Sequence, residues 1–395
     1  MRVLLFTGKG GVGKTTAAAG AAVLASRRGL KTLVLSTDAA HSLCDALDVT
    51  AGSEPVEACA GLHVAQVDTQ ARFQRSWGEV RGYLLALLDT AGADEVMAEE
   101  LTVLPGAEEV LALLEVRDQV RSGRWDLVVV DCAPTAETLR LLALPEALSW
   151  YLHRIFPPEH QVVRALRPML GRVSGLPVPP DAVFTAMARL QAELAEVRQV
   201  LTAPGASVRL VLTPEAVVVA EARRTLTSLS LFGYRVDGVV ANRVFPADGG
   251  PDPWRAGWVA SQALQLAEVE RSFAPLPVLR APYCPAEPVG AAALGDLADR
   301  TYGETDPFAD PGPEGPMHVE RSGEEFVLSL ALPFADRDGM DLVRVGDELV
   351  LTVGSSRRVL ALPSALRRCT VAGAALRDGR LRIRFEPDPA LWMGL

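Results

Sequence analysis

The residues Gly8-Lys9-Gly10-Gly11-Val12-Gly13-Lys14-Thr15-Thr16 decide the fold. The apolar run Val3 to Thr7 before them predicts a buried strand, and the alanine-rich stretch Ala17 to Arg28 after them favours a helix. A glycine loop between a strand and a helix is typical of a phosphate-binding loop, because the loop amides and the helix N-terminus together attract an anion. The sequence therefore predicts that this whole stretch binds the polyphosphate of a nucleotide.

Lysine usage supports this interpretation of the loop. The chain contains three lysines, Lys9, Lys14 and Lys31, and two of them lie in the loop. A phosphate loop requires a compact ammonium group and not the planar fork of arginine. We expect Lys14 to act in catalysis by contacting the β- and γ-phosphates of ATP, and the Thr15 hydroxyl to hold Mg²⁺.

Length and composition limit the possible classes of protein. The 395 residues predict two or three domains, and no run of about 18 apolar residues indicates a transmembrane helix. The net charge of −10 argues against a nucleic-acid-binding surface. Because Met1-Arg2 leads directly into the first strand, we expect no signal peptide and a cytoplasmic location.

The cysteines are scattered and include no CxxC pair, so they predict reduced, mostly buried thiols and neither a zinc site nor a disulfide framework. They are Cys44, Cys59, Cys132, Cys284 and Cys369.

Two acidic residues follow further predicted strands. The run Thr32 to Thr37 brings Asp38 to the carboxyl edge of the sheet, where open α/β folds bind ligands. Asp38 is either the N-cap of the residues after it or a carboxylate that orients water, and beside a phosphate loop we favour the second role. Asp131 ends the apolar run that begins at Asp126, and we expect it to act on the Mg²⁺ side of the site.

The rest of the first domain alternates helices and strands. Leu62 to Asp68, Val208 to Thr213 and Val236 to Asn242 predict strands, and about 69–121 and 144–204 predict a helical insert. No lysine follows Lys31, so a guanine-reading NKxD motif is impossible and adenine is favoured by elimination. Asn242 could meet the base, and the proline-rich loop 281–290, which includes Pro282, could cover it.

A change in the period of the hydrophobic pattern marks a second domain. The Pro/Gly/Asp-rich stretch 303–316 predicts a linker between residues 1–302 and 317–395, and it predicts that residues 1–302 fold and hydrolyse ATP alone. Short strands separated by turns then predict a small all-β sandwich. The expected strands are Phe326–Pro333, Leu349–Val353, Arg358–Pro363 and Leu381–Phe385.

These motifs resemble those of a known family. Residues 9–16 resemble the deviant Walker A loop with its extra lysine, residues 38–42 the DPAHS switch I, and residues 131–135 the DTAPT switch II. Residues 105–109, Pro-Gly-Ala-Glu-Glu, also look like an element of that family. Over roughly 1–302 the chain is thus similar to the ArsA family of anion-pump and tail-anchored-protein targeting ATPases.

The resemblance implies a fold and a mode of action. The expected fold is α/β, a P-loop NTPase with a mostly parallel sheet and a helical subdomain, and the expected assembly is a homodimer around two ATP molecules. Lys9 is then a catalytic residue that reaches the partner's phosphates, Asp38 orients the attacking water, and Asn242 and Pro282 hold adenine. The tail resembles an α-crystallin-type small heat-shock domain, since Gly379-Arg380-Leu381 matches that fold's G-x-L.

The chain also departs from the family pattern. Ala39 replaces the switch I proline, Cys132 the usual threonine and Ala136 a glycine, which bears on switch flexibility but leaves the Mg²⁺ and water roles intact. The zinc-binding CxxC of the eukaryotic targeting ATPases is absent, so a dimer must close without that metal. ArsA itself is a tandem duplication with metalloid-binding cysteines, whereas this chain has one ATPase unit.

Three functions remain open. The first is an ATP-switched carrier of hydrophobic protein segments; its client would be a hydrophobic protein or a membrane-protein partner. The second is the energising subunit of an arsenite-type efflux pump, and the third is a partitioning or scaffold ATPase. For the first, Met169, Phe184, Met187 and Leu190 are candidates for a client groove, although an apolar stripe at helical spacing is usually core.

Overall fold

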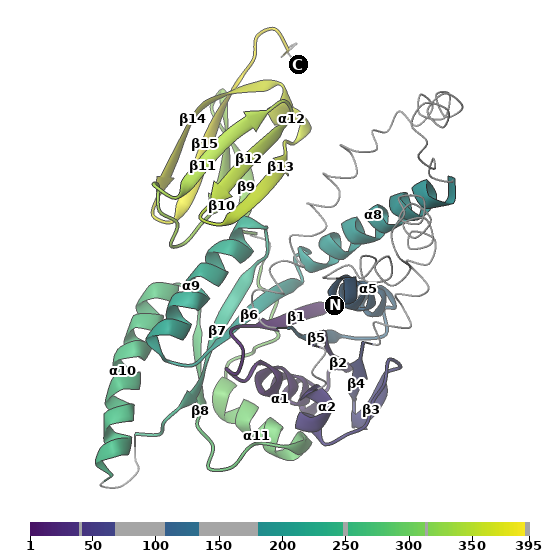
Figure 1. Cartoon of the computed structure of the whole chain (residues 1–395), viewed down its shortest axis with the longest axis vertical. Helices are drawn as coiled ribbons and strands as arrows, with labels where there is room; N and C mark the ends of the chain where they lie inside the picture. The colour runs from purple at the N-terminus through teal and green to yellow at the C-terminus, as the bar shows by residue number, and fades with distance from the viewer. Residues whose placement is uncertain (39–41, 68–106, 134–180, 248–251, 313–314, 392–395) are drawn as a thin grey trace, which may run out of the picture.

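The computed structural model describes residues 1–38, 42–67, 107–133, 181–247, 252–312 and 315–391. Within these residues an eight-stranded sheet has the order β3-β4-β2-β5-β1-β6-β7-β8, and β3 pairs antiparallel with β4 while the other pairs are parallel (Figure 1). The strands are β1 Arg2–Thr7, β2 Thr32–Ser36, β3 Val56–Cys59, β4 Leu62–Gln66, β5 Leu127–Asp131, β6 Ala206–Leu212, β7 Val236–Val244 and β8 Val278–Pro282.

Helices flank the sheet in groups. The helices α1, α2 and α11 contact one another beneath the central strands, whereas α5 contacts α8 and α9 contacts α10 (Figure 1). The bounds are α1 Lys14–Arg27, α2 Ser42–Leu47, α5 Ala107–Arg121, α8 Asp181–Leu201, α9 Ala216–Leu231, α10 Pro253–Phe273 and α11 Gly290–Tyr302.

Small side chains let α1 lie close to its neighbours. Its alanines from Ala18 to Ala25 are fully buried, and a Cβ on Gly20 would approach the Leu294 carbonyl oxygen of α11 to 3.0 Å. The alanine-rich sequence therefore provides both helix propensity and the close packing that holds the phosphate loop at the sheet edge.

The predicted α/β class is confirmed, with a few corrections to the elements. The edge strands β3 and β8 were not predicted, and β8 includes Ala281 and Pro282, which the sequence had assigned to a loop. The helices α5 and α8 belong to the predicted helical insert, whose segments 69–106 and 144–180 lie outside the described residues. No helix among the described residues has the length and apolar character needed to cross a membrane.

A buried charge cluster joins three strands at the end of the sheet opposite the phosphate loop. Asp237 of β7 accepts hydrogen bonds at 2.8 Å from both Arg2 of β1 and Arg209 of β6, and at 2.7 Å from Ser207. The arginine side chains are 9% and 5% exposed. Because their charges are buried, they depend on this carboxylate.

The C-terminal domain is the predicted all-β sandwich. Counting only what the structure describes, one sheet has the order β14-β15-β10-β9 and the other β11-β12-β13, and a leucine-rich core lies between them. The bounds are β9 Met317–Ser322, β10 Glu325–Ala331, β11 Met340–Val345, β12 Glu348–Val353, β13 Ser356–Ala361, β14 Cys369–Arg377 and β15 Arg380–Pro387, with a short helix α12 at Ser364–Arg367. The turn residues Asp378 and Gly379, both with positive φ, join β14 to β15 as expected.

The predicted linker is packed against the first domain over its described part. Pro307 is buried and its carbonyl oxygen accepts a hydrogen bond from Arg209 at 3.0 Å. The Arg28 guanidinium lies 5.9 Å from the centre of the Phe308 ring. We call residues 303–312 the strap, because these contacts hold them on the ATPase-like domain.

The C-terminal domain packs on α9 and α10 (Figure 1). Leu231, the last residue of α9, belongs to the hydrophobic core of the sandwich. Phe334 of the sandwich meets Phe273 of α10 edge to face, with ring centres 5.8 Å apart. The linker composition did not predict this contact between the domains.

Candidate functional site

The phosphate loop has a backbone that requires glycine. Gly13 has φ 89°, and a Cβ there would lie 2.3 Å from the Asn242 amide nitrogen. A Cβ on Gly8 would lie 2.1 Å from the carbonyl oxygen of Val211 in β6. Gly10 and Gly11 are exposed, whereas Lys14, the first residue of α1, is 7% exposed. The loop thus packs on β6 and β7 and keeps its glycine-rich tip open.

Asn242 supports this loop from below. It is 7% exposed; its amide nitrogen donates to the Val12 carbonyl oxygen at 2.8 Å, and its amide oxygen accepts from the Arg243 backbone at 2.9 Å. The sequence predicted that Asn242 contacts adenine. That role stays a prediction, and the structure adds a second one, because the side chain links the end of β7 to the phosphate loop.

Thr15 and Asp131 meet at the start of α1, as the sequence predicted for an Mg²⁺ site. The Thr15 hydroxyl donates to one Asp131 carboxylate oxygen at 2.8 Å and lies 3.2 Å from the Ser42 hydroxyl. The Ser36 hydroxyl donates to the same Asp131 oxygen at 3.4 Å. These four side chains come from α1, α2, β2 and β5, and we call the place where they meet the Asp131 corner.

The second Asp131 carboxylate oxygen indicates whether this site suits a cation. It is buried and has no hydrogen-bond partner among the described residues. Burial raises the pKa of Asp131 to about 6, although the Thr15 hydrogen bond and the Lys14 charge act in the opposite direction. A buried carboxylate oxygen beside a hydroxyl is a donor set that suits Mg²⁺, so the residues fit the ion.

Asp38 lies at the same edge, beside the Asp131 corner. It is half-buried, its backbone amide donates to the Ser36 hydroxyl at 3.1 Å, and its charge contributes to the raised pKa of Asp131. Thr37 bridges the two strand ends: its hydroxyl donates to the Asp131 carbonyl oxygen and accepts from the Ala133 amide, both at 3.4 Å. Residues 39–41 of the predicted switch I and residues 134–135 of the predicted switch II lie outside the described residues.

Cys132, which stands where the resembled family has threonine, is an unreactive thiol here. It is 3% exposed, and burial raises its pKa above the usual range of a thiol. All five cysteines are free, but the prediction of buried thiols is correct only for Cys132 and Cys369, since the other three are half-buried. Within the described residues no three His, Cys, Asp or Glu side chains are grouped to hold a metal.

Lys9 faces a carboxylate of its own chain. Its ammonium nitrogen lies 3.8 Å from a Glu221 oxygen of α9, and the two side chains are 40% and 30% exposed. The sequence predicted that Lys9 contacts the phosphates of a second subunit, and this stays a prediction. Glu221 was missed, since nothing in the sequence relates a helix more than 200 residues away to the loop.

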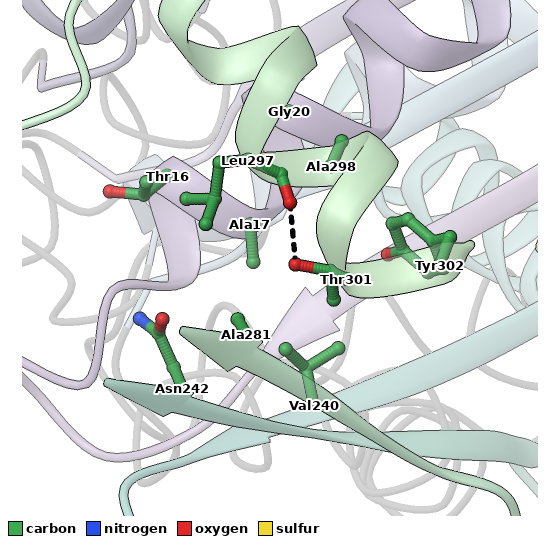
Figure 2. Close-up of a pocket in the computed structure, with 10 residues that line it drawn as sticks. All are labelled: Thr16, Ala17, Gly20, Val240, Asn242, Ala281, Leu297, Ala298, Thr301 and Tyr302. Atoms are coloured by element: carbon green, nitrogen blue, oxygen red, sulfur yellow. Dashed lines mark hydrogen bonds between the residues drawn. The ribbon is translucent and has the colours of Figure 1, made fainter. Parts of the chain in front are cut away.

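A small cavity lies between α1, α11 and the ends of β7 and β8, next to Asn242 (Figure 2). Its volume is about 20 Å³, which holds about one water molecule and no adenine ring. Pro282 is the last residue of β8 and is half-buried. The cavity is lined by Thr16, Ala17, Gly20, Val240, Asn242, Ala281, Leu297, Ala298, Thr301 and Tyr302.

The candidate client residues are located only in part. Phe184, Met187 and Leu190 lie along α8, but their side chains are outside what the structure describes, and Met169 lies in the segment 134–180 that it does not describe. The sequence also missed Ser36 and Thr37. Two hydroxyl residues at the end of a buried strand, directly before Asp38, were the available signal.

Comparison with known proteins gives matches over both domains. Residues 1–303 match the family described as "Anion-transporting ATPase", and residues 323–385 match the "HSP20-like domain found in ArsA". The chain is 42% identical over 394 residues to "Uncharacterized protein SCO2128" of Streptomyces coelicolor, covering 99% of each chain. It is 37% identical over 390 residues to a "Putative arsenical pump-driving ATPase" of Chlorobaculum tepidum, covering 98% of this chain and 96% of the relative. It is 37% identical over 423 aligned positions to "Protein Rv2184c" of Mycobacterium tuberculosis, covering 99% of this chain and 97% of the relative.

Proposed function

Because the chain belongs to the ArsA family of anion-transporting ATPases and carries that family's HSP20-like domain, we propose that it is a homodimeric, ATP-hydrolysing switch that binds and delivers hydrophobic protein segments. The main support for the proposal is that one chain contains both an ATPase-type site and a small heat-shock-type domain. A phosphate loop with a cation corner at Thr15 and Asp131 supports ATP hydrolysis. A small heat-shock-type domain packed on the same ATPase domain supports the handling of apolar protein surface.

The chain's own residues account for the chemical step. The loop amides and the Lys14 ammonium bind the phosphates, and Asp38 accepts a hydrogen bond from the attacking water and so orients it. Thr15 and Asp131 would hold Mg²⁺, which supplies neutralisation of the phosphate charge. Asn242 keeps the loop in the shape that this binding needs.

The homodimer gives Lys9 its role. Its side chain is 40% exposed at the open tip of the loop, so a second copy facing this edge can receive it. Closing two copies over ATP then excludes bulk water from both sites while the attacking water stays bound, and opening them after hydrolysis changes the surface offered to a client.

The Asp38→Asn variant tests the chemistry. We expect normal ATP binding and a turnover lower by a factor on the order of 10³, as for the loss of other positioning groups in phosphoryl transfer. Equilibrium dialysis with ATP and a phosphate-release assay measure the two quantities. Near-normal hydrolysis with stoichiometric ATP binding would remove Asp38 from the site.

Photo-crosslinking tests the client. A photo-reactive apolar helix is added to the full chain with and without ATP, and the adducts are mapped by mass spectrometry. We expect nucleotide-dependent adducts at Phe184, Met187 or Leu190, because a hydrophobic groove binds the apolar face of a helix along its length. Labelling that is confined to the tail or absent in both states would contradict client binding by the ATPase domain.

A second candidate function is the one that appears in the names of several relatives. The relatives from Chlorobaculum tepidum and Aquifex aeolicus are named "Putative arsenical pump-driving ATPase" and "Putative arsenical pump-driving ATPase 1". As the energising subunit of such a pump, the chain would hydrolyse ATP faster when arsenite or antimonite is added. Unchanged turnover over a metalloid titration, with clients still crosslinked, would leave the first proposal.

A further inference from the structure

The solvent exposure of helix α9 changes along its length. Its first half has an exposed side, where Val217 is 68% exposed. From Thr225 to Leu231 nearly every residue is buried, including Thr227 and Ser230. A helix on the surface of a single domain normally keeps one polar face in water. The second half of α9 is therefore covered from both sides.

The C-terminal domain provides the outer cover. The Thr227 hydroxyl donates to the Pro333 carbonyl oxygen, and the Ser228 hydroxyl lies 3.5 Å from that of Ser356. Arg358 of β13 is 2% exposed and donates to the Leu231 carbonyl oxygen at the C-terminal end of α9. A cation at this end of a helix stabilises the helix dipole.

Phe334 connects the helix pair to the sandwich. Besides its contact with Phe273 of α10, its ring lies 5.5 Å from the Arg223 guanidinium of α9. Arg223 in turn forms an ion pair with Glu268 of α10. The position of the sandwich and the position of α9 thus depend on the same side chains.

Two residues before Arg223, the same helix carries Glu221, whose carboxylate lies 3.8 Å from the Lys9 ammonium of the phosphate loop. We propose that Glu221 is a positioning residue that holds Lys9 back on its own chain, and that the C-terminal domain, by fixing α9, sets the strength of this hold. The inference rests on the proposed phosphate-binding role of Lys9, and not on client delivery.

The physical basis is competition for one ammonium group. The Lys9 ammonium cannot make a close contact with the Glu221 carboxylate and with a phosphate at the same time. The ion pair must therefore loosen before the phosphate contact forms. A half-exposed ion pair is weak and shifts an equilibrium by a factor of about five at most. A weak hold is what a reversible switch needs, because ATP can release it.

A double-mutant cycle tests the first part of the proposal on the full chain. We expect Glu221→Gln to tighten ATP binding by a factor of about two to five, measured as a dissociation constant by calorimetry. The same substitution in a Lys9→Met background should leave that constant unchanged. Glu215→Gln is the matched control: it removes the same charge at the N-cap of α9 and should have no effect.

Two results would overturn the positioning role. One is that Glu221→Gln changes the dissociation constant of ATP equally in the presence and absence of Lys9, since this would reflect only the loss of one negative charge from the protein. The other is no effect at all in a chain that binds ATP normally. A wild-type chain that does not bind ATP would contradict the proposed function itself, so the two failures can be told apart.

The second part concerns the C-terminal domain. Phe334→Ala removes the ring between Arg223 and Phe273 but no charge, and we expect it to tighten ATP binding in the same direction as Glu221→Gln. In the Glu221→Gln background Phe334→Ala should then add nothing. Equal effects in both backgrounds would show that the domain does not act through Glu221. Hydrogen exchange of α9 peptides, measured on the same variant, confirms that the helix stays folded.

Discussion

At the scale of single residues, Asp131 shows how burial and charge oppose each other. Its carboxylate is fully buried, and burial raises its pKa to about 6 from the ordinary 3.8. Because the folded chain then binds a proton more tightly than the unfolded chain, this group favours folding at low pH. The benefit is lost as pH rises from about 4 to about 6.

Asp131→Asn should therefore stabilise the chain without metal at pH 8, and about half of that benefit should remain at pH 5, which lies within the range where the cost develops. A difference of about 2 pKa units corresponds to about 3 kcal/mol, an upper value because the variant changes the Thr15 hydrogen bond. Thermal melts in chelator at both pH values measure the effect. Lower stability than wild type at pH 8 would contradict the assigned cost. With Mg²⁺ and ATP the wild type should become the more stable of the two, since a charged carboxylate holds the ion more tightly than a neutral amide.

Asn242 permits a test that separates its two possible roles. Asn242→Asp keeps the shape of the side chain but replaces the donor to the Val12 carbonyl oxygen by a second acceptor. We expect binding of both ATP and inorganic tripolyphosphate to weaken by about tenfold, from the loss of a buried hydrogen bond. If the residue only contacts adenine, tripolyphosphate binding will be unchanged. Filter-binding competition measures both ligands on one preparation.

The sequence was sufficient to place the loop, Thr15 and Asp131 together at one edge of the sheet, because the loop follows the apolar run of β1 directly and Asp131 ends the apolar run of β5. Their roles in binding stay predictions. Glu221 and the support of the loop by Asn242 could not be predicted in this way. They arise where β7 and α9 fold back onto residues 8–15, and their partners are more than 200 positions away.

At the scale of secondary-structure elements, burial decides which strands were predictable. The inner strands β1, β2, β5 and β6 are buried along their whole length and appear as continuous apolar runs. The strands that were missed in the sandwich are β9, β11 and β14, which lie at sheet edges. Their exposed residues interrupt the apolar pattern, as in β9, where all six are exposed.

The buried charge cluster that joins β1, β6 and β7 gives a prediction at this scale. Asp237→Asn leaves the buried guanidinium groups of Arg2 and Arg209 without their carboxylate, and we expect a loss of about 3–5 kcal/mol in the free energy of unfolding. Asp296→Asn is the control, since its side chain is 72% exposed in an ion pair with Arg27 and should cost about 1 kcal/mol or less. Urea unfolding of both variants measures the difference. Equal losses would show that burial does not set the cost.

At the scale of the whole molecule, the arrangement of the domains lay beyond the sequence. The Pro/Gly/Asp content of 303–316 predicts a linker, but composition does not reveal that Arg209 and Arg28 bind it as a strap. Docking of the sandwich depends on surfaces of α9 and α10, which each look like ordinary buried helix faces. Which domain covers their apolar residues could not be inferred from the sequence.

Removal of residues 303–395 tests the consequence of this arrangement. Leu231 and Phe273 lose their cover, and exposing two large apolar side chains costs about 3–6 kcal/mol. We expect residues 1–302 to hydrolyse ATP at 25 °C, as the sequence predicts, but to unfold roughly 10 °C below the full chain. Differential scanning calorimetry and a phosphate-release assay measure both. A melting temperature equal to that of the full chain would show that the docked domain adds no stability.

The sandwich can cover α9 and α10 only after it has been synthesised. Residues 303–395 leave the ribosome after the first domain, and at about 5–20 residues per second their synthesis takes on the order of 5–20 s. During this interval the first domain has its sheet but not the sandwich that buries Leu231 and Phe273. We therefore expect each newly made copy to present an apolar patch for some seconds, during which chaperones could bind the chain itself.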